Sequence, residues 1–459
     1  MNESDKAETD GQLTSLGEFL GSADGAVPFG EIERFVKGSR WYLGSQSAKL
    51  DYLVCTKKGD EKVPPFLLRI MAKDESGEFW NLPVMVSLEP MNALTVVEVS
   101  RPDGRSWFLY DACSNLVGQK ALLGDLAIPR KDVRFSSKSF EQSNTSFIYG
   151  DLYVKLYRRL VAHKNREVKV LEALLGVLEG EVPRVIGAGE LCGYSSHLVL
   201  ESLDGSRDLY GVVKDLLIRG ETEKVKGYLS NLGATLFRLH KALRGVFGTG
   251  SLSTNQLYAH SCDRVRERIT LLKTTPASSM YDTNQLDRVF ERLSELTKAS
   301  QLGVNLSATE GEGNTRCQIQ VIHGDLHLGQ ILLYKDRQVV IDFEGEVLGE
   351  TGQWFGRPEY DLAGIARSIH YASFESGYLS KKGSRVSELE EAFVEAYTTH
   401  LADSLDSAET VFDRKIYELL KIEKAVYELE YEVRAQRGLV AIPASFLFDG
   451  GGEQSDERT

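Results

Sequence analysis

Two short apolar runs, each of which ends in polar groups, are the feature that most constrains the fold of this chain. The first run leads into Asp325 and Gln330 within residues 321–333, and the second, residues 339–341, leads into Asp342. Apolar runs of this length, bounded by glycine and charged residues, predict two strands with short loops at their ends. The strand ends would bring a carboxylate, an amide oxygen and a second carboxylate to one point.

Oxygen groups in this arrangement are typical of phosphoryl transfer from a nucleotide. One carboxylate can accept the proton of an acceptor hydroxyl, while the amide and the other carboxylate hold Mg²⁺ against the phosphates. The alternative is a β-hairpin whose acidic residues are solvated turn residues. Because each strand ends in a suitable group, and in the required order, the metal–phosphate site is the preferred interpretation.

His323 and His327 also have the spacing of a zinc-binding pair. Two histidines four residues apart chelate one metal ion when they share a helix face, and Gly324 and Gly329 argue against a helix here. We therefore expect His323 to pack inside the loop and to orient the backbone of Asp325. His327 is a candidate for contact with the substrate.

A phosphoryl-transfer site also needs a phosphate cradle and a cation, and residues 140–167 offer both. A hairpin that turns at residues 150–151 carries Lys155 among apolar neighbours, where an unpaired ammonium group would be costly. Glu167, on a helix expected at residues 164–178, is its natural partner; the alternative is a strand-edge lysine whose ammonium group reaches solvent. The segment before the hairpin is rich in small polar residues whose amides and hydroxyls could cover phosphates: Ser143, Asn144, Thr145 and Ser146.

Composition and missing motifs exclude several other classes of protein. With 54 Lys and Arg against 67 Asp and Glu, the net charge of −13 opposes nucleic-acid binding, although a local nest of amides and a lysine can still hold a phosphate. No P-loop motif occurs, and the pair Gly187 and Gly189 is too short for a dinucleotide fingerprint. Because the chain has scattered cysteines, no run of 18 apolar residues and no signal-peptide pattern, we expect a cytoplasmic protein that does not bind a membrane.

The apolar pattern changes along the chain. Short alternating runs predict a mainly β module between residues 29 and 126, with strands near residues 49–55, 66–71, 85–88, 95–99 and 107–110. Beyond residue 208 the periodicity predicts helices near residues 212–218, 221–243, 286–298, 386–401 and 412–437. Residues 303–316 lack an apolar period and predict a mobile loop.

Several motifs resemble those of the bacterial maltokinases, a branch of the aminoglycoside phosphotransferase-like kinases. The similar segments are His323–Gln330, Asp342–Glu346, Glu141–Ser146, Val154–Leu160, Asp361–Ala372, Tyr427–Arg434 and, in the N-terminal cap, Arg40–Gly44. The resemblance therefore covers nearly the whole chain, from the cap to about Pro443.

The resemblance implies an α+β fold: a bilobal, protein-kinase-like (aminoglycoside phosphotransferase-like) architecture with a β-rich N-terminal cap and a helical C-lobe. The implied parts are a flexible N-terminal arm (residues 1–25), the cap (26–131), the kinase N-lobe (132–204), the helical C-lobe (205–448) and a disordered tail (449–459). It also implies ATP and Mg²⁺ as cofactors, maltose as the acceptor and maltose 1-phosphate as the product.

The resemblance further assigns roles in the catalytic segment. Carried onto the matching positions, these roles make Asp325 the catalytic base and make Gln330 and Asp342 ligands of Mg²⁺. Glu344 would bind a second Mg²⁺ or the waters of the first. Asp361 is expected to be a buried helix N-cap that holds the catalytic loop in place.

The resemblance also assigns the nucleotide contacts. Lys155 and Glu167 together would position the α- and β-phosphates. The adenine would lie against a hinge near residues 200–203, which includes Glu201.

The acceptor region departs from the pattern of the maltokinases. That family usually has Asp where this chain has His370, and residues 437–443 lack the tryptophan that usually precedes the Ile-Pro pair. Tyr427 and Tyr431, with Arg434 nearby, could form one wall of a sugar site, but their spacing equally fits the apolar stripe of an amphipathic helix.

Three functions therefore stay open. The first choice is an ATP-dependent kinase whose small-molecule partner is maltose. The second is a kinase for glucosamine, another amino sugar or an aminoglycoside, whose cationic acceptor would need carboxylates in the pocket. The third is a regulatory pseudokinase that binds a nucleotide and uses the cap as a partner surface; its support is the altered acceptor region alone.

Overall fold

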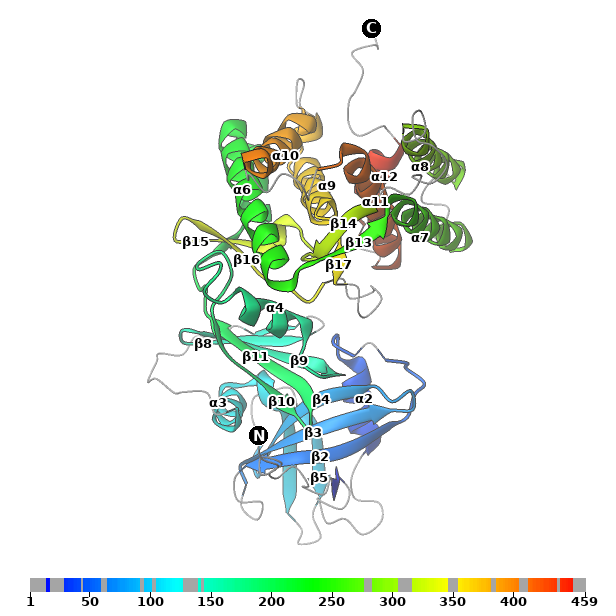
Figure 1. Cartoon of the computed structure of the whole chain (residues 1–459). Helices are drawn as coiled ribbons and strands as arrows, with labels where there is room; N and C mark the ends of the chain where they lie inside the picture. The colour runs from blue at the N-terminus through cyan, green and yellow to red at the C-terminus, as the bar shows by residue number, and fades with distance from the viewer. Residues whose placement is uncertain are drawn as a thin grey trace, which may run out of the picture. The chain divides into compact units, whose positions relative to one another are not determined.

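The computed structural model describes residues 14–16, 29–42, 44–58, 64–90, 95–100, 105–126, 139–141, 144–275, 283–303, 316–345, 354–380, 385–403, 412–435 and 438–448. The chain divides into two compact units (Figure 1). The N-terminal unit comprises Met1–Glu172 and Pro183–Asp204, and the C-terminal unit comprises Ala173–Val182 and Gly205–Thr459. The predicted tail, residues 304–315 of the predicted mobile loop, and Ser143 lie outside the described residues.

One antiparallel sheet runs through the N-terminal unit in the order β1-β2-β3-β4-β9-β11-β10 (Figure 1). β5 and β6 extend it beside β4, and β7 and β8 extend it beside β9. The bounds are β1 (Thr14–Ser15), β2 (Leu50–Lys58), β3 (Phe66–Asp74), β4 (Phe79–Ser87), β5 (Thr95–Ser100), β6 (Ser106–Asp111), β7 (Ser139–Glu141), β8 (Thr145–Tyr149), β9 (Leu152–Ala162), β10 (Val185–Leu191) and β11 (Tyr194–Glu201). The helices of this part are α2 (Phe29–Gly38), α3 (Leu116–Asp125) and α4 (Arg166–Leu174), with a 3₁₀ turn η1 (Ala112–Ser114) before α3.

Neighbouring residues of β3 and β4 enter different hydrophobic cores, as the two-residue period of a strand requires. Leu68 lies opposite Val84, and both pack in one core with Trp80. Leu67 lies opposite Met85, and both pack in the other core. Both faces of these central strands are therefore covered.

The predicted cap and the predicted N-lobe share this sheet. β4, which belongs to the predicted cap, pairs with the end of β9, which belongs to the predicted N-lobe. Asn81 on β4 is fully buried and donates its Nδ2 to the carbonyl oxygens of Tyr157 at 3.2 Å and Ser196 at 3.3 Å. The boundary at residue 131 remains a prediction, and the strands on its two sides form one continuous sheet.

Helices dominate the C-terminal unit (Figure 1). They are α5 (Leu209–Arg219), α6 (Thr222–Phe247), α7 (Thr254–Thr274), α8 (Thr283–Gly303), α9 (Glu359–Glu375), α10 (Val386–Asp403), α11 (Arg414–Ala435) and α12 (Ala441–Phe448). Two small antiparallel sheets accompany them: β12 (Arg207–Asp208), β15 (Ile331–Tyr334) and β16 (Arg337–Val340), and β13 (Thr249–Ser253), β14 (Arg316–Val321) and β17 (Phe355–Gly356). None of the helices in the described ranges is long and apolar enough to cross a membrane.

Local sequence signals set the ends of several of these helices. The side chain of Asp208 accepts a hydrogen bond from the amide of Gly211 at the start of α5, and Gly220 ends this helix with a φ of +76°. The helices predicted near residues 212–218, 221–243, 286–298, 386–401 and 412–437 are confirmed as α5, α6, α8, α10 and α11. The apolar periodicity did not predict α9, because this helix is buried on nearly all sides and so lacks an amphipathic period. A helix at this place was expected only from the N-cap role given to Asp361.

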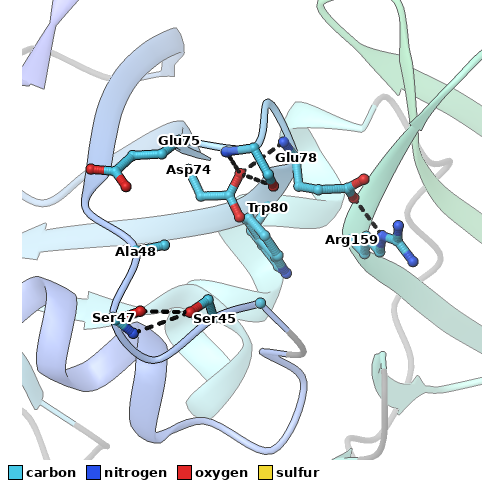
Figure 2. Close-up of a pocket in the computed structure, with 10 residues that line it drawn as sticks. Ser45, Ser47, Ala48, Asp74, Glu75, Glu78, Trp80 and Arg159 are labelled. Carbon is cyan, nitrogen blue, oxygen red and sulfur yellow. Dashed lines mark hydrogen bonds and ion pairs between the residues drawn. The ribbon is translucent and has the colours of Figure 1, made fainter.

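A shallow pocket of about 410 Å³ lies in the N-terminal unit, between β3, β4 and the segment before β2 (Figure 2). Two of its three acidic side chains, Asp74 and Glu78, have hydrogen-bond partners within the chain. Oδ1 of Asp74 accepts hydrogen bonds from the amides of Ser76 at 3.0 Å and Glu78 at 2.9 Å, and Oε2 of Glu78 accepts one from Nε of Arg159 at 2.6 Å. None of the site residues predicted from the sequence lines this pocket.

A buried arginine links the two parts of the sheet. Arg158 on β9 is fully buried; its Nη2 donates to Asp111 at 2.5 Å and its Nη1 to the carbonyl oxygen of Asn81 at 3.2 Å. Its Nε donates to the hydroxyl of Thr145 at 2.8 Å, and the guanidinium lies 4.8 Å from the ring centroid of Trp41. A buried charge is tolerated only when it is paired and hydrogen-bonded, so these partners fix β9 against the rest of the sheet.

We predict that Arg158→Met destabilises the protein by about 3–5 kcal/mol, because it leaves the buried carboxylate of Asp111 without its cation. Arg159→Met is the matched control. Arg159 pairs with Glu78, both side chains are 41% exposed, and exposed pairs of this kind contribute about 0–1 kcal/mol. The free energies of unfolding in urea provide the comparison, and equal losses for the two variants would contradict the role assigned to Arg158.

Candidate active site

The short hairpin β15–β16 brings the predicted metal ligands together. Ile331, the first residue of β15, lies opposite Val340, the last residue of β16. Gln330 directly precedes the hairpin and Asp342 follows it, so the hairpin register makes them neighbours. Nε2 of Gln330 donates to Oδ2 of Asp342 at 3.1 Å, and the amide of Ile341 donates to the carbonyl of Gln330 at 3.0 Å. The amide nitrogen makes this bond, which leaves the amide oxygen as the atom that could bind a cation.

Asp342 has an unusual backbone conformation. Its φ is +67°, in the left-handed region that residues other than glycine seldom adopt, although Asp tolerates it better than most. Such conformations persist where the surrounding structure over-determines them, and they concentrate at functional sites. Here the bonds between residues 330 and 341–342 fix the turn and point the carboxylate at Gln330. Glu344 lies two residues further in the same turn and is partly exposed.

His323 connects the two halves of the candidate site. Its Nε2 lies 2.9 Å from the carbonyl oxygen of Ile341, which can only accept, so Nε2 carries the proton. Its Nδ1 accepts from the backbone amide of Asp325 at 3.3 Å. The ring therefore orients the backbone of Asp325, as predicted. The zinc alternative is wrong for this residue, because His323 is fully buried and both ring nitrogens are used.

The carboxylate of Asp361 on α9 holds the backbone of the same loop. Oδ2 accepts from the amide of His323 at 2.7 Å and lies 3.0 Å from Nε2 of His240, while Oδ1 accepts from the amide of Gly324 at 2.9 Å. The expectation that Asp361 is a helix N-cap is wrong: Pro358 occupies that position, and Asp361 lies in the first turn of α9. The side chain holds the loop as expected, but from inside the helix.

The pKa of Asp361 reflects these partners. Burial raises the pKa of this carboxyl group, but the hydrogen bond and charge of His240 and the amide of Gly324 outweigh burial and lower the pKa to about 2. Asp361 is therefore ionised at neutral pH although it is fully buried. On the far side of His240, Nδ1 lies 3.0 Å from the hydroxyl of Tyr397.

Gly364 allows α9 to approach the loop closely. A Cβ atom at this position would lie 2.1 Å from the carbonyl oxygen of Leu326, the residue after Asp325. One turn later, the hydroxyl of Ser368 accepts from the amide of Leu328 at 3.1 Å. Neither Gly364 nor His240 was predicted as a functional residue. A glycine inside an apolar helical segment is a signal that could have identified Gly364. No local sequence signal distinguishes His240.

The N-terminal unit contains the predicted lysine–glutamate pair. Nζ of Lys155 on β9 donates to Oε2 of Glu167 on α4 at 2.8 Å, and the hydroxyl of Tyr157 donates to the same oxygen at 3.2 Å. Lys155 is 7% exposed and Glu167 is 2% exposed, so the alternative of a lysine that reaches solvent is wrong. Glu167 lies in the first turn of α4, where the free backbone N–H groups and the helix dipole favour a negative charge.

The other residues predicted to contact the nucleotide have mixed surroundings. Oδ1 of Asn144 accepts from the amide of Arg158 at 3.1 Å. Thr145 and Ser146 begin β8 and are 1% and 5% exposed, and the hydroxyl of Thr145 accepts from Arg158. The Glu201 carboxylate, at the end of β11, accepts from the amide of Arg184 at 3.0 Å.

The predicted acceptor residues on α11 lie along one side of the helix. Tyr427 and Tyr431 stack with their ring centroids 6.5 Å apart, and the guanidinium of Arg268 lies 4.6 Å from the Tyr427 centroid. Tyr431 is 43% exposed, so the core-stripe alternative does not describe it. Nη2 of Arg434 bonds Glu430 at 2.9 Å.

Two carboxylates on α11 lie next to these tyrosines. Oε2 of Glu428 accepts from Nε of Arg367 at 2.9 Å and from Nη2 at 2.8 Å. Burial raises the pKa of Glu428, and the neighbouring Glu432, which is 1% exposed, adds to the rise. One turn before Glu428, the Cε of Lys424 lies 3.5 Å from the position of a Cβ on Gly364, which connects this side of α11 to the catalytic loop.

The two histidines predicted to contact the substrate differ in their surroundings. His327 is exposed and caps the 3₁₀ turn η3 (Leu328–Gln330), where its Nδ1 accepts from the amide of Gly329 at 3.1 Å. His370 is 4% exposed and lies on α9, nine residues beyond Asp361. It lines a pocket whose lining includes no residue of the catalytic loop.

The chemistry of Gln330, Asp342 and Glu344 fits Mg²⁺. Among the described residues, no three His, Cys, Asp or Glu side chains form a ready metal cluster. Mg²⁺ does not need one, because it keeps several waters and is usually held by one or two carboxylates together with substrate phosphates. The amide oxygen of Gln330 and the carboxylates of Asp342 and Glu344 are the hard oxygen ligands that this ion prefers.

We predict that Gly364→Ala destabilises the protein by about 1–3 kcal/mol, because the new methyl group meets a backbone carbonyl that cannot move without shifting the loop. Gly227→Ala is the matched control. Gly227 is exposed within α6 and has nothing within 4 Å of its Cβ position, so the change should stabilise by about 0.5–1 kcal/mol. Urea unfolding gives both values, and a neutral or stabilising Gly364→Ala would refute the close approach.

We also predict a pH signature for Asp361. The pKa of this group is about 2 in the folded protein and about 3.9 in the unfolded chain, so the unfolded chain binds more protons between these values. The stabilising contribution, about 2–3 kcal/mol, is complete above pH 5 and is lost as the pH falls through 2.

Asp361→Asn removes this titration. The difference in free energy of unfolding between the natural protein and Asp361→Asn should therefore shrink by about 1 kcal/mol between pH 6 and pH 3. The exposed Asp403 on α10 serves as the control, since Asp403→Asn should show no such trend. If the difference in free energy of unfolding between the natural protein and Asp361→Asn stays constant from pH 6 to pH 3, the lowered pKa of Asp361 is contradicted.

Comparisons with known proteins place this geometry in a family. A glucosamine kinase from Streptacidiphilus jiangxiensis is 30% identical over 136 residues, which cover 28% of this chain and 31% of that protein. The match thus spans less than a third of the length of this curated relative.

Two solved structures are similar over most of their length. A structure described as glucosamine kinase in complex with glucosamine, ADP and inorganic phosphate has a TM-score of 0.63 at 19% identity, with 95% of this chain and 99% of that chain covered. A glucosamine kinase in another crystal form has a TM-score of 0.60 at 20% identity, with 89% and 96% covered. At these identities the likeness concerns the fold, and it confirms the expected α+β, protein-kinase-like class.

The family itself is identified by a longer match. Residues 133–407 match the model of the phosphotransferase enzyme family, and this match covers more than half of the 459 residues. The range includes Lys155 and Glu167, the loop with Asp325, and the Gln330–Asp342 pair. The chain therefore belongs to the phosphotransferase enzyme family.

Proposed function

We propose that this chain is a kinase that transfers the γ-phosphate of ATP to a hydroxyl group of an amino sugar, with glucosamine as the first acceptor to test. The observation that carries the proposal is the loop at residues 323–330. Asp361 and His323 fix its backbone, and it carries Asp325 five residues before the Gln330 that bonds Asp342. Phosphoryl transfer needs a positioned carboxylate and a metal-binding oxygen set of this kind.

In this proposal Asp325 is the catalytic base. It is partly exposed, and its backbone amide is oriented by His323, so its carboxylate can meet an acceptor hydroxyl and take its proton. Gln330, Asp342 and Glu344 would hold Mg²⁺. The ion, when bound, would neutralise the charge that develops on the phosphate oxygens during transfer.

The proposed nucleotide contacts come from the N-terminal unit. Lys155 would contact the α- and β-phosphates, because its ammonium group is held in place by Glu167. The segment that includes Ser143 and Asn144 would cover the phosphates. The end of β11 at Glu201 would provide the hinge for the adenine. The ADP bound in the similar glucosamine kinase complex supports a nucleotide of this kind.

Carboxylates near the catalytic loop support an amino-sugar acceptor. Glu428 and Glu432 lie one turn apart on α11, and both Arg367 bonds to Glu428 use Oε2, so Oε1 lies outside this ion pair. Burial and, to a smaller extent, the charge of Glu432 raise the pKa of Glu428, and a neighbouring ammonium group would stabilise the charged form of this carboxylate. Tyr431, His327 and Arg434 would contact the sugar hydroxyls. The glucosamine kinases among the similar proteins support this choice of acceptor.

Maltose was the first acceptor suggested by the sequence, and nothing in the described residues favours it over an amino sugar. Residues 437–443 offer no aromatic ring for a second sugar unit. A catalytically inactive pseudokinase is also less well supported. The lysine, its glutamate partner, the candidate base and both candidate metal ligands at residues 330 and 342 are all chemically competent groups.

We predict that Asp325→Asn lowers turnover by about 10²–10⁴-fold while nucleotide binding is kept, because the variant keeps the shape of the side chain but cannot take a proton. A coupled assay of ADP release measures turnover, and titration with a fluorescent ATP analogue measures binding. Asp336→Asn, at the exposed turn between β15 and β16, is the matched control and should keep its activity. Turnover within tenfold of the natural protein would refute Asp325 as the base.

The same assay, run on glucosamine, glucose, maltose, trehalose and an aminoglycoside, tests the acceptor. A kcat/KM for glucosamine at least tenfold above that for glucose would support recognition of the amine. Faster turnover of maltose would keep the catalytic assignment and reject the amino sugar. Nucleotide binding without turnover of any acceptor would favour the pseudokinase.

A further inference from the structure

A second pocket, of about 220 Å³, lies within the C-terminal unit and is lined by residues of α8, α9, α10, α11 and α12. It is separate from the catalytic loop. Its lining includes none of the loop residues 323–330, although α9 contacts that loop at Gly364 and Ser368 and lines the pocket with Ala366, Arg367 and His370. The pocket lining includes Arg367, His370, Glu390, Arg414, Lys421 and Phe446.

Arg367 presents one unused corner of its guanidinium to this pocket. Its Nε and Nη2 both bond Glu428, at 2.9 and 2.8 Å, and Phe446 covers one face, with its ring centroid 4.2 Å from the guanidinium carbon. Nη1 is buried and has no protein hydrogen-bond partner, and the residue is 1% exposed. A buried charged donor without a partner is costly, so this atom calls for a ligand or an ordered solvent molecule.

His370 presents a second buried nitrogen to the same pocket. Its Nδ1 has no protein partner, and its ring makes an edge contact with Phe446 at 5.7 Å between centroids. Burial together with the charges of Arg367 and Lys421 lowers the pKa of His370 to about 3. The imidazole is therefore neutral at physiological pH, and Nδ1 can donate a hydrogen bond when the proton resides there.

Carboxylates also line the pocket, and each of them is paired with a cation. Glu390 and Glu418 are bonded by Lys421 at 2.6 and 3.1 Å, and Arg414 bonds Glu391 at 3.2 Å and Glu418 at 3.4 Å. The remaining charged group in the lining is Arg292 of α8. The carboxylates are thus neutralised by partners, whereas Arg367 and His370 still offer donors.

We propose that this pocket is a binding site for a small oxyanion, a phosphate or carboxylate group, held by Nη1 of Arg367 and Nδ1 of His370. The two donors without protein partners favour a negative oxygen, and the lining carboxylates are paired with Lys421 and Arg414, which lowers their repulsion of an anion. This assignment replaces the predicted substrate role of His370. It does not depend on the proposed kinase activity, because every group lies outside the catalytic loop.

The test is NMR spectroscopy of the imidazole groups in the full-length chain, without nucleotide or metal. The chain has eight histidines, and His370→Gln identifies the resonance of His370 by its disappearance. Inorganic phosphate and acetate are titrated separately against sodium chloride at constant pH and ionic strength. We expect a saturable shift of the His370 resonance with one or both oxyanions and none with chloride. The arm that saturates at lower concentration identifies a phosphate or a carboxylate as the better ligand.

Two variants make the assignment specific. Arg367→Gln should weaken binding by at least tenfold, since it removes the charged donor. Because this change also releases Glu428, Ser387→Trp gives an independent check: Ser387 is an exposed residue of the pocket lining, and the larger side chain should block entry. The exposed His260 on α7 should show no saturable shift. A His370 resonance that does not respond to oxyanions, or one that responds equally in Ser387→Trp, would overturn the proposal.

Discussion

The buried carboxylate of Asp361 is the interaction on which the candidate active site depends. Taking this charge out of water is expensive, and the cost is offset only by three donors that converge on its two oxygens, the amides of His323 and Gly324 and the ring of His240. Two of the three belong to the loop that carries Asp325. The backbone of the loop therefore cannot change without leaving the buried carboxylate of Asp361 without partners. The position of Asp325 thus depends on a charge that α9 holds in the interior.

Local chemistry was enough to predict part of this site. A lysine among apolar strand residues demands an anion, and the next helix supplies Glu167, so the pair could be predicted from the sequence. The hairpin that joins Gln330 to Asp342 could also be predicted, because both strands are short and adjacent. The Asp361–His240 contact joins residues 121 positions apart on helices whose pairing no local pattern specifies. The same reason explains why the sequence missed the role of Gly364.

The acceptor side and the second pocket were harder to predict for a related reason. α9 is buried on nearly every side, so its sequence does not reveal which neighbour each residue meets. His370 and Asp361 lie on this one helix. His370 lines the second pocket, whereas Asp361 bonds the catalytic loop. Arg367 lies between them in the sequence. Its guanidinium lines the second pocket and also bonds Glu428 of the proposed acceptor site.

The continuous sheet of the N-terminal unit has a consequence for how such a chain can diversify. Arg158 and Lys155 lie three residues apart on β9; the former is neutralised by a side chain of the β module, and the latter is a candidate for the nucleotide. An exchange of the first 126 residues with those of another protein would leave the guanidinium in the interior without its counter-ion. The β module therefore cannot be exchanged independently of β9. We expect the two to have evolved together, because Asp111 of the module neutralises Arg158 of the strand.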